Sequence, residues 1–159
     1  MDIFEFAIQM ERDGEAFYRN LAEKAEHTGI KRIFTMLAED EIKHQNAIDA
    51  LRTASRVDMV STEILANAKN VFADLSPASW SGETVQIDLY KQAQEIERKS
   101  QAFYEEKAAT LDEGAAKSLL LQIAEEEKRH YFLLDNLIEF VNRPQSWLEN
   151  AEFVHLDEY

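Results

Sequence analysis

An internal repeat with an offset of 86 residues constrains the fold more than any other feature, because both copies must adopt the same local structure. In the first copy the repeated residues are Ala7, Glu11, Phe17-Tyr18, Ala22, Ala38, Glu41, His44 and Leu51, which align with Ala93, Glu97, Phe103-Tyr104, Ala108, Ala124, Glu127, His130 and Leu137. No insertion or deletion separates the aligned positions. The repeat predicts two copies of one supersecondary unit.

Apolar residues recur at helical spacing in two long segments of each copy. These segments run from Phe4 to Ala25, from Ile30 to Leu51, from Leu89 to Leu111 and from Leu119 to Val141. The third helix is expected to start near Thr84, and Pro144 should stop the fourth. With only 4 Gly and 2 Pro in 159 residues, the chain lacks the turn formers of a protein with many short strands. We therefore expect an all-α four-helix bundle of two repeated helical hairpins.

A weakly patterned connection joins the two hairpins over about residues 52–83. It contains a predicted short helix over 63–72, followed by the breakers Ser76-Pro77 and Ser81-Gly82. We expect one domain over residues 1–143 and a tail over 144–159, whose Trp147, Leu148, Ala151, Phe153 and Val154 suggest a short C-terminal helix. Trp80 and other apolar residues outside the four helical stripes favour a homodimer.

The charge balance narrows the choice of partners. Asp and Glu number 31 against 17 Lys and Arg, so the net charge is −14, which repels nucleic acid and anionic membranes and attracts cations. No apolar run approaches the roughly 18 residues of a membrane span, and the acidic start is unlike a secretory signal. The lack of Cys excludes disulfides, iron–sulfur clusters and thiol catalysis. A cytoplasmic protein with neither nucleic-acid nor membrane partners is expected.

Six ionisable residues interrupt the apolar stripes. They are Glu11, Glu41, His44, Glu97, Glu127 and His130. In each copy a lone Glu precedes the Glu of a Glu-x-x-His motif by 30 residues, so the two carboxylates can reach similar heights on antiparallel helices. Desolvating such carboxylates without a counter-charge costs several kcal/mol each. The pattern therefore calls for cations in the bundle interior.

Two divalent metals would balance the four carboxylates. Residues i and i+3 share a helix face, so each Glu-x-x-His can direct a carboxylate and an imidazole at one point. Oxygen and nitrogen ligands favour iron or manganese, with zinc as a possible substitute. Because Glu is abundant here, one Glu-x-x-His alone would be weak support, whereas two at matched spacing are specific. Two Glu and two Glu-x-x-His on four helices are the ligands of ferritin-like di-metal bundles.

The chain resembles the rubrerythrin branch of the ferritin-like proteins over roughly residues 3–141. The resemblance lies in Ala7-Ile8-Gln9-Met10-Glu11, Phe17-Tyr18 and the run from Leu37 to His44, and in Glu97, Phe103-Tyr104 and the run from Ile123 to His130. It implies a site of two iron ions in which Glu41 and Glu127 bridge the metals, Glu11 and Glu97 are terminal ligands, and His44 and His130 each bind one iron. It also implies reaction of the reduced pair with hydrogen peroxide or dioxygen.

Two departures from the family pattern leave the reaction open. Peroxidase-type rubrerythrins usually carry a further Glu one turn from the terminal ligand, where this chain has Gln94 and Ser100. They also append a rubredoxin module, which a chain without Cys cannot form, so electrons would come from an external donor such as a rubredoxin-type protein. The six-ligand set also suits a bacterioferritin-like ferroxidase or iron-storage protein. A helical scaffold with a structural metal and no turnover is the third hypothesis.

The remaining polar residues near the stripes have two interpretations each. Tyr18 and Tyr104 lie seven residues after Glu11 and Glu97. By resemblance, each tyrosine hydroxyl should hydrogen-bond a ligand carboxylate of the opposite half. The alternative is that each is an ordinary core tyrosine. The pairs Glu39-Asp40 and Glu125-Glu126 are predicted to form a solvated face, with attraction of ferrous ions as the alternative. His27 and His155 are predicted to be surface residues.

Overall fold

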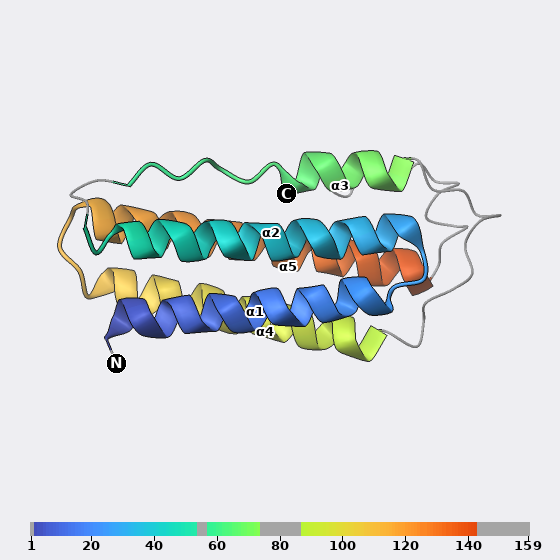
Figure 1. Cartoon of the computed structure of the whole chain (residues 1–159), viewed down its shortest axis with the longest axis horizontal. Helices are drawn as coiled ribbons and strands as arrows, with labels where there is room; N and C mark the ends of the chain where they lie inside the picture. The colour runs from blue at the N-terminus through green and yellow to red at the C-terminus, as the bar shows by residue number, and fades with distance from the viewer. Residues whose placement is uncertain (1, 54–56, 74–86, 143–159) are drawn as a thin grey trace.

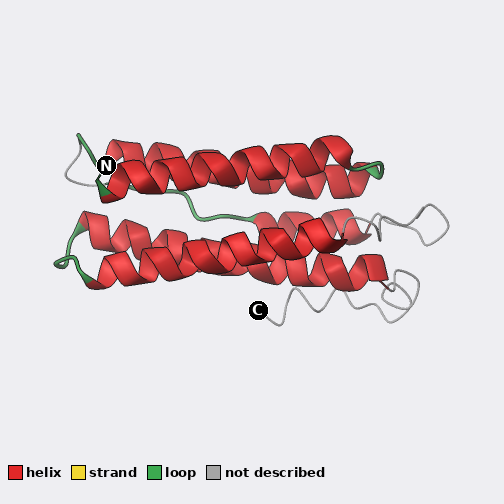
Figure 2. Cartoon of the chain, turned by 90° about the horizontal axis from the view of Figure 1, so that it is seen from below, coloured by secondary structure: helices red, strands yellow, loops and turns green. Residues whose placement is uncertain are grey.

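The computed structural model describes residues 2–53, 57–73 and 87–142. Its helices are α1 (Ile3–Lys24), α2 (Thr28–Ala50), α3 (Ile64–Ala73), α4 (Ile87–Ala109) and α5 (Ala115–Asn142). Within these ranges there is no strand, as Figure 2 shows. The predicted all-helical bundle is confirmed.

Local side-chain contacts explain where the first two helices begin. The Asp2 carboxylate caps α1 by accepting a 2.8 Å hydrogen bond from the Glu5 amide. His27 caps α2, because its Nδ1 accepts a 3.1 Å hydrogen bond from the Gly29 amide. The prediction that His27 is simply a surface residue was incomplete, since this half-buried ring satisfies a free amide at the start of a helix.

The two hairpins pack as antiparallel pairs, α1 on α2 and α4 on α5. Their connecting turns lie at opposite ends of the bundle, so the chain must run back along its length between α2 and α4 (Figure 1). Residues 57–63 run alongside α2 before α3 begins, and α3 contacts both α2 and α5. Residues 57–63 and α3 therefore cover the face of the bundle where α2 meets α5.

A polar layer divides the apolar core in two. One cluster includes Ile33, Phe34, Leu37, Phe72 and Leu134, and the other includes Ile8, Ile48, Leu119, Leu120 and Ile123. The Glu and His residues that interrupt the stripes lie in the bundle interior with them. The apolar faces predicted from periodicity therefore form the core, and the Glu and His residues within those faces lie together in one layer.

Several predictions concern parts of the chain at or beyond the limits of the described ranges. The predicted short helix over 63–72 corresponds to α3, which is shifted by one residue. The predicted start at Thr84, Trp80, the tail helix and His155 lie outside the described residues. No helix in the described ranges combines the length and hydropathy that crossing a membrane requires.

Candidate metal centre

All six predicted ligands meet at the centre of the bundle, each from the helix on which its repeat places it. They form two groups, Glu11, Glu41, His44 and Glu127 on one side and Glu41, Glu97, Glu127 and His130 on the other. Within each group one potential ligand atom per residue lies within 4.8 Å of the others, and every residue is buried. Glu41 and Glu127 belong to both groups, which is the arrangement a pair of bridging carboxylates requires.

Each imidazole turns its Nδ1 atom toward the carboxylates. His44 Nδ1 lies 3.3 Å from Glu11 Oε2 and 3.0 Å from Glu127 Oε1. His130 Nδ1 lies 3.2 Å from Glu97 Oε1 and 3.4 Å from Glu41 Oε1. The two rings stack with centroids 5.9 Å apart. Both rings therefore present the same nitrogen to a shared carboxylate cluster, as the repeat predicts.

The opposite nitrogen of each ring, Nε2, hydrogen-bonds a carboxylate from the other hairpin. These two residues, Asp40 and Glu126, are called the outer carboxylates. His44 Nε2 donates to Glu126 Oε1 at 2.9 Å, and His130 Nε2 donates to Asp40 Oδ2 at 2.8 Å. A proton held on Nε2 leaves the Nδ1 lone pair free for a metal. The prediction that these two acids lie on a solvated face was therefore wrong, because the α2–α5 contact encloses Glu126 fully and Asp40 largely. Their neighbours Glu39 and Glu125 are exposed, as expected.

The two tyrosines link the hairpins in the same crosswise manner. Tyr104 donates from its hydroxyl to Glu11 Oε1 at 2.6 Å, and Tyr18 donates to Glu97 Oε1. Both side chains are buried. Of the two interpretations of these residues, the structure has the one in which each hydroxyl bonds a carboxylate of the opposite half.

Burial and neighbouring charges shift the pKa values of the cluster residues in different directions. Burial raises the pKa of Glu41 and of Glu127 well above 4.5, and the charges of neighbouring Glu residues raise both further. Burial acts most strongly to raise the pKa of Glu11, but the charge of His44 and hydrogen bonds from Glu41, His44 and Tyr104 together lower that pKa to about 2. Burial likewise acts to lower the pKa of His44, yet the charges of Glu11 and Glu41 and hydrogen bonds to Glu11 and Glu126 together raise it to about 10. Without metal, the cluster therefore retains protons at neutral pH.

The donor set fits a pair of divalent cations. Among the described residues, the buried oxygens Glu41 Oε1, Glu97 Oε2 and Glu127 Oε1 accept no hydrogen bond, although Glu127 Oε1 lies within ion-pair distance of His44. Buried carboxylate oxygens without donors are costly unless a cation neutralises them. Carboxylate and imidazole ligands are those that iron and manganese accept. The buried Glu and His residues could therefore hold metal ions.

The two positions one turn from Glu97, where a further carboxylate ligand could lie, carry Gln94 and Ser100 and so supply no acid to the cluster. The Gln94 amide points toward α5, where its Nε2 lies 3.3 Å from both the Tyr131 carbonyl oxygen and Asp135 Oδ1. Ser100 lies opposite Gly14, its counterpart in the repeat, in the lining of a pocket between α1 and α4. The four carboxylates and two imidazoles are thus the ligands available to the centre from these helices.

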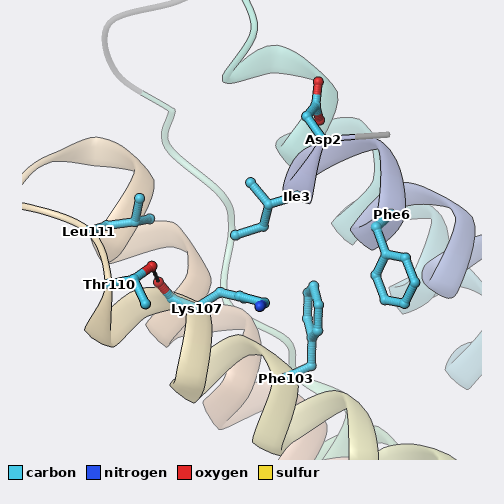
Figure 3. Close-up of a pocket in the computed structure, with 7 residues that line it drawn as sticks. All are labelled: Asp2, Ile3, Phe6, Phe103, Lys107, Thr110 and Leu111. Carbon is cyan, nitrogen blue, oxygen red and sulfur yellow. Dashed lines mark hydrogen bonds between the residues drawn. The ribbon is translucent and has the colours of Figure 1, made fainter.

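Two apolar pockets line the seam between α1 and α4. One, of about 530 Å³, has Phe6, Met10, Phe17, Ile96 and Phe103 in its wall and reaches Gly14 and Ser100. The other, of about 500 Å³, shares Phe6 and Phe103 and extends to the end of the bundle, as Figure 3 shows. A Cβ atom added to Gly14 would lie 3.1 Å from Glu41 Oε2. Gly14 therefore lies both in the wall of this pocket and against one of the shared carboxylates.

Sequence reasoning missed the roles of Asp40 and Glu126, and it missed Thr62. Thr62 lies in the crossover and hydrogen-bonds both outer carboxylates. The available signal was the repeat itself, since positions 40 and 126 are acidic in both copies. That signal was shared by Glu39 and Glu125, so it could not separate the buried pair from the exposed one. No pattern in the crossover indicated Thr62.

Comparisons with known proteins relate the chain to one family and one solved structure. A family model described as rubrerythrin matches residues 2–138. Among solved structures, the chain is similar to a hypothetical protein from Pyrococcus furiosus, with 27% sequence identity, 88% of each chain covered and a TM-score of 0.66. A comparison with curated proteins gave no match.

Proposed function

The chain belongs to the rubrerythrin family, and on that premise we propose that its buried cluster holds two iron ions and reduces hydrogen peroxide, or dioxygen, with electrons from a separate donor protein. The observation that carries the proposal is the pair of four-residue groups sharing Glu41 and Glu127. Two neighbouring sites with shared carboxylates suit two metals acting together. Manganese or zinc could occupy the same ligands.

The side chains would hold the metals in a fixed arrangement. Glu41 and Glu127 would serve both ions, Glu11 and Glu97 one each, and His44 and His130 one each through Nδ1. The hydroxyls of Tyr18 and Tyr104 hold the two terminal carboxylates in place. The chemistry that a bound ferrous pair would supply is two electrons, which with two protons would convert one hydrogen peroxide molecule to two water molecules. The remaining work of the protein is to orient ligands and exclude bulk water.

The seam between α1 and α4 is the proposed approach for the oxidant. Gly14 and Ser100 line its mainly apolar pocket, and Gly14 lies against Glu41 of the cluster. Hydrogen peroxide and dioxygen are small and uncharged, so they can enter a mainly apolar pocket at little desolvation cost. The crossover and α3 cover the opposite face, where α2 meets α5.

We propose that the electrons come from a separate protein, since these 159 residues contain no Cys with which to build a rubredoxin centre. We propose a rubredoxin-type donor and a homodimeric assembly. A ferroxidase function is the second candidate, because Gln94 and Ser100 replace the further carboxylate of peroxidase-type rubrerythrins. Assembly into a large shell in solution would favour the ferroxidase.

The test starts from protein reconstituted anaerobically with ferrous salt. Elemental analysis should give two irons per chain, and addition of one equivalent of peroxide should produce the absorption of an oxo-bridged diferric pair. Sustained peroxide consumption with a reductant should follow, and it should disappear in Glu127→Ala. Full iron binding without turnover would leave a structural or ferroxidase role, and failure to bind iron would contradict the proposal entirely.

A further inference from the structure

Thr62, in the described part of the crossover, hydrogen-bonds the two carboxylates that contact the histidines, Asp40 and Glu126. It lies two residues before α3, in the segment that follows α2 along the bundle (Figure 1). It is not a candidate metal ligand, and it is half-buried over the α2–α5 face. Its contacts nonetheless reach both outer carboxylates.

The hydroxyl of Thr62 has a defined orientation. Its Oγ1 accepts a 3.1 Å hydrogen bond from the Ile64 amide, so its single hydrogen is available to Asp40 Oδ2, which lies 2.5 Å away. The same oxygen of Asp40 accepts the hydrogen bond from His130 Nε2. The hydroxyl therefore restrains the group that orients the His130 ring.

The backbone of Thr62 makes the matching contact on the other side. Its amide donates a 2.9 Å hydrogen bond to Glu126 Oε2, while Glu126 Oε1 accepts from His44 Nε2. One residue thus contacts both outer carboxylates, with its side chain toward His130 and its main chain toward His44. Lys43 Nζ adds charge nearby, 3.4 Å from Glu126 Oε1 and 3.7 Å from Asp40 Oδ1.

We propose that Thr62 is a positioning residue that sets the orientation of both histidines, through Asp40 and through Glu126. The inference rests on the proposed function, since it concerns how those histidines receive metal. Groups that hydrogen-bond a ligating imidazole fix its ring and its tautomer, and their loss typically costs about 10–100-fold in metal affinity. Because the two contacts use different atoms of Thr62, removing the hydroxyl should weaken only the His130 side.

The experiment is an anaerobic titration with ferrous iron of the wild type, Thr62→Val and Thr62→Ser. Valine keeps the backbone amide and the branched shape but removes the hydroxyl, so one of two iron equivalents should bind about tenfold more weakly, the lower end of the loss that follows removal of a direct partner of a ligating imidazole. Serine restores the hydroxyl and should restore wild-type affinity. Thr35→Val is the matched control, because its hydroxyl bonds only the Lys31 carbonyl on the surface of α2.

Two double variants identify which side is affected. In His44→Ala, the metal that remains should depend on His130, and adding Thr62→Val should weaken its binding by about tenfold. In His130→Ala, the remaining metal depends on His44, and Thr62→Val should change its affinity by less than about threefold. Cobalt(II) absorption of the same proteins should change with Thr62→Val only in the His44→Ala background, which a general loss of stability would not produce.

The outcomes separate the two proposals. A wild-type protein that binds no iron contradicts the proposed function, whatever the variants do. A wild type with two irons and a Thr62→Val of unchanged affinity overturns the role of Thr62 alone, as does an equal loss on both sides. If Thr62→Val does not fold, Thr62→Ala removes the same hydroxyl without adding a methyl group against Asp40, and the same selective loss is required of it.

Discussion

Tyr104 and Glu11 belong to different hairpins, yet the tyrosine hydroxyl donates a 2.6 Å hydrogen bond to the carboxylate. Burial raises the pKa of Tyr104 well above 10, and the charge of Glu11 raises it further, so the hydroxyl keeps its proton. It can therefore act only as a neutral donor in the physiological range. Glu11 thus accepts a hydrogen bond from a residue 93 positions away in the chain.

Replacing this hydroxyl should weaken metal binding. In Tyr104→Phe, Glu11 loses a donor, and the affinity for ferrous iron should fall about 10–100-fold. Tyr90→Phe is the matched control, because Tyr90 is also buried on α4 but packs against Phe34 with ring centroids 5.1 Å apart. Anaerobic iron titration of both variants checks the prediction. Equal affinities in the two variants would show that the hydrogen bond to Glu11 has no influence on the centre.

Glu127→Gln should change the metal-free and metal-loaded proteins in opposite directions. Burial and three neighbouring carboxylates raise the pKa of Glu127, so at pH 8 its neutral replacement should stabilise the metal-free protein, by about 1.4 kcal/mol for each unit by which that pKa is raised. The same change removes a shared ligand and should reduce bound iron below two per chain. Urea unfolding with chelator and elemental analysis measure the two effects. Glu125→Gln, at an exposed position next to it, should produce neither.

The metal-free protein should lose stability as the pH rises from 6.5 to 10. The folded-state pKa of His44 is raised to about 10 from 6.5, so its contribution is complete below pH 6.5 and disappears through this window. The raised pKa values of Glu41 and Glu127 act in the same direction from pH 4.5 upward. Each pKa unit is about 1.4 kcal/mol, which moves the melting temperature by about 3–6 °C in a domain of this size.

Melting curves in the presence of chelator check this pH dependence. At the acid end the trend reverses, because the lowered pKa of Glu11, about 2, makes its contribution disappear as the pH falls from 4.5 toward 2. Iron-loaded protein should show a flatter profile between pH 6.5 and 10, since the metals replace the protons as counter-charges. A metal-free melting temperature that rises steadily with pH over that window would contradict the assignment.

Gly14→Ala should weaken iron binding without lowering the stability of the metal-free protein. Alanine in a helix interior gains about 0.5–1 kcal/mol over glycine, but the added Cβ would lie 3.1 Å from Glu41 Oε2 and displace that carboxylate. We expect an unchanged or higher melting temperature without metal and about tenfold weaker iron binding. Ser100→Ala is the control, because it keeps its Cβ at the equivalent position of the other repeat. An affinity equal to wild type would mean that Glu41 moves aside without consequence.

Periodicity and the repeat were sufficient to predict the long helices and to bring the six ligand positions together. The reason is physical: Glu11 and Glu41 lie 30 residues apart on the apolar faces of one hairpin, so burying those faces brings them into one layer. The repeat then imposes the same layer on Glu97 and Glu127. Long amphipathic segments leave little freedom in where such residues end up.

The outer contacts could not be predicted in this way. Asp40 lies four residues before His44 on α2 but bonds His130 on α5, so its partner depends on how the hairpins are placed together and not on local spacing. Thr62 depends on the path of an irregular crossover, which no periodicity constrains. Neither the contact between Asp40 and His130 nor the contacts of Thr62 can be read from sequence spacing. Contacts between separately patterned elements are the part that required the structure.

The crosswise pairing of Tyr18 with Glu97, Tyr104 with Glu11, and each histidine with an acid of the opposite hairpin has a consequence for how the duplicated halves can change. A substitution in one half alters a residue whose partner is encoded in the other, so neither half is free to diverge alone. Separated halves would each carry orphaned donors and acceptors, and should recover a working centre only by recombining.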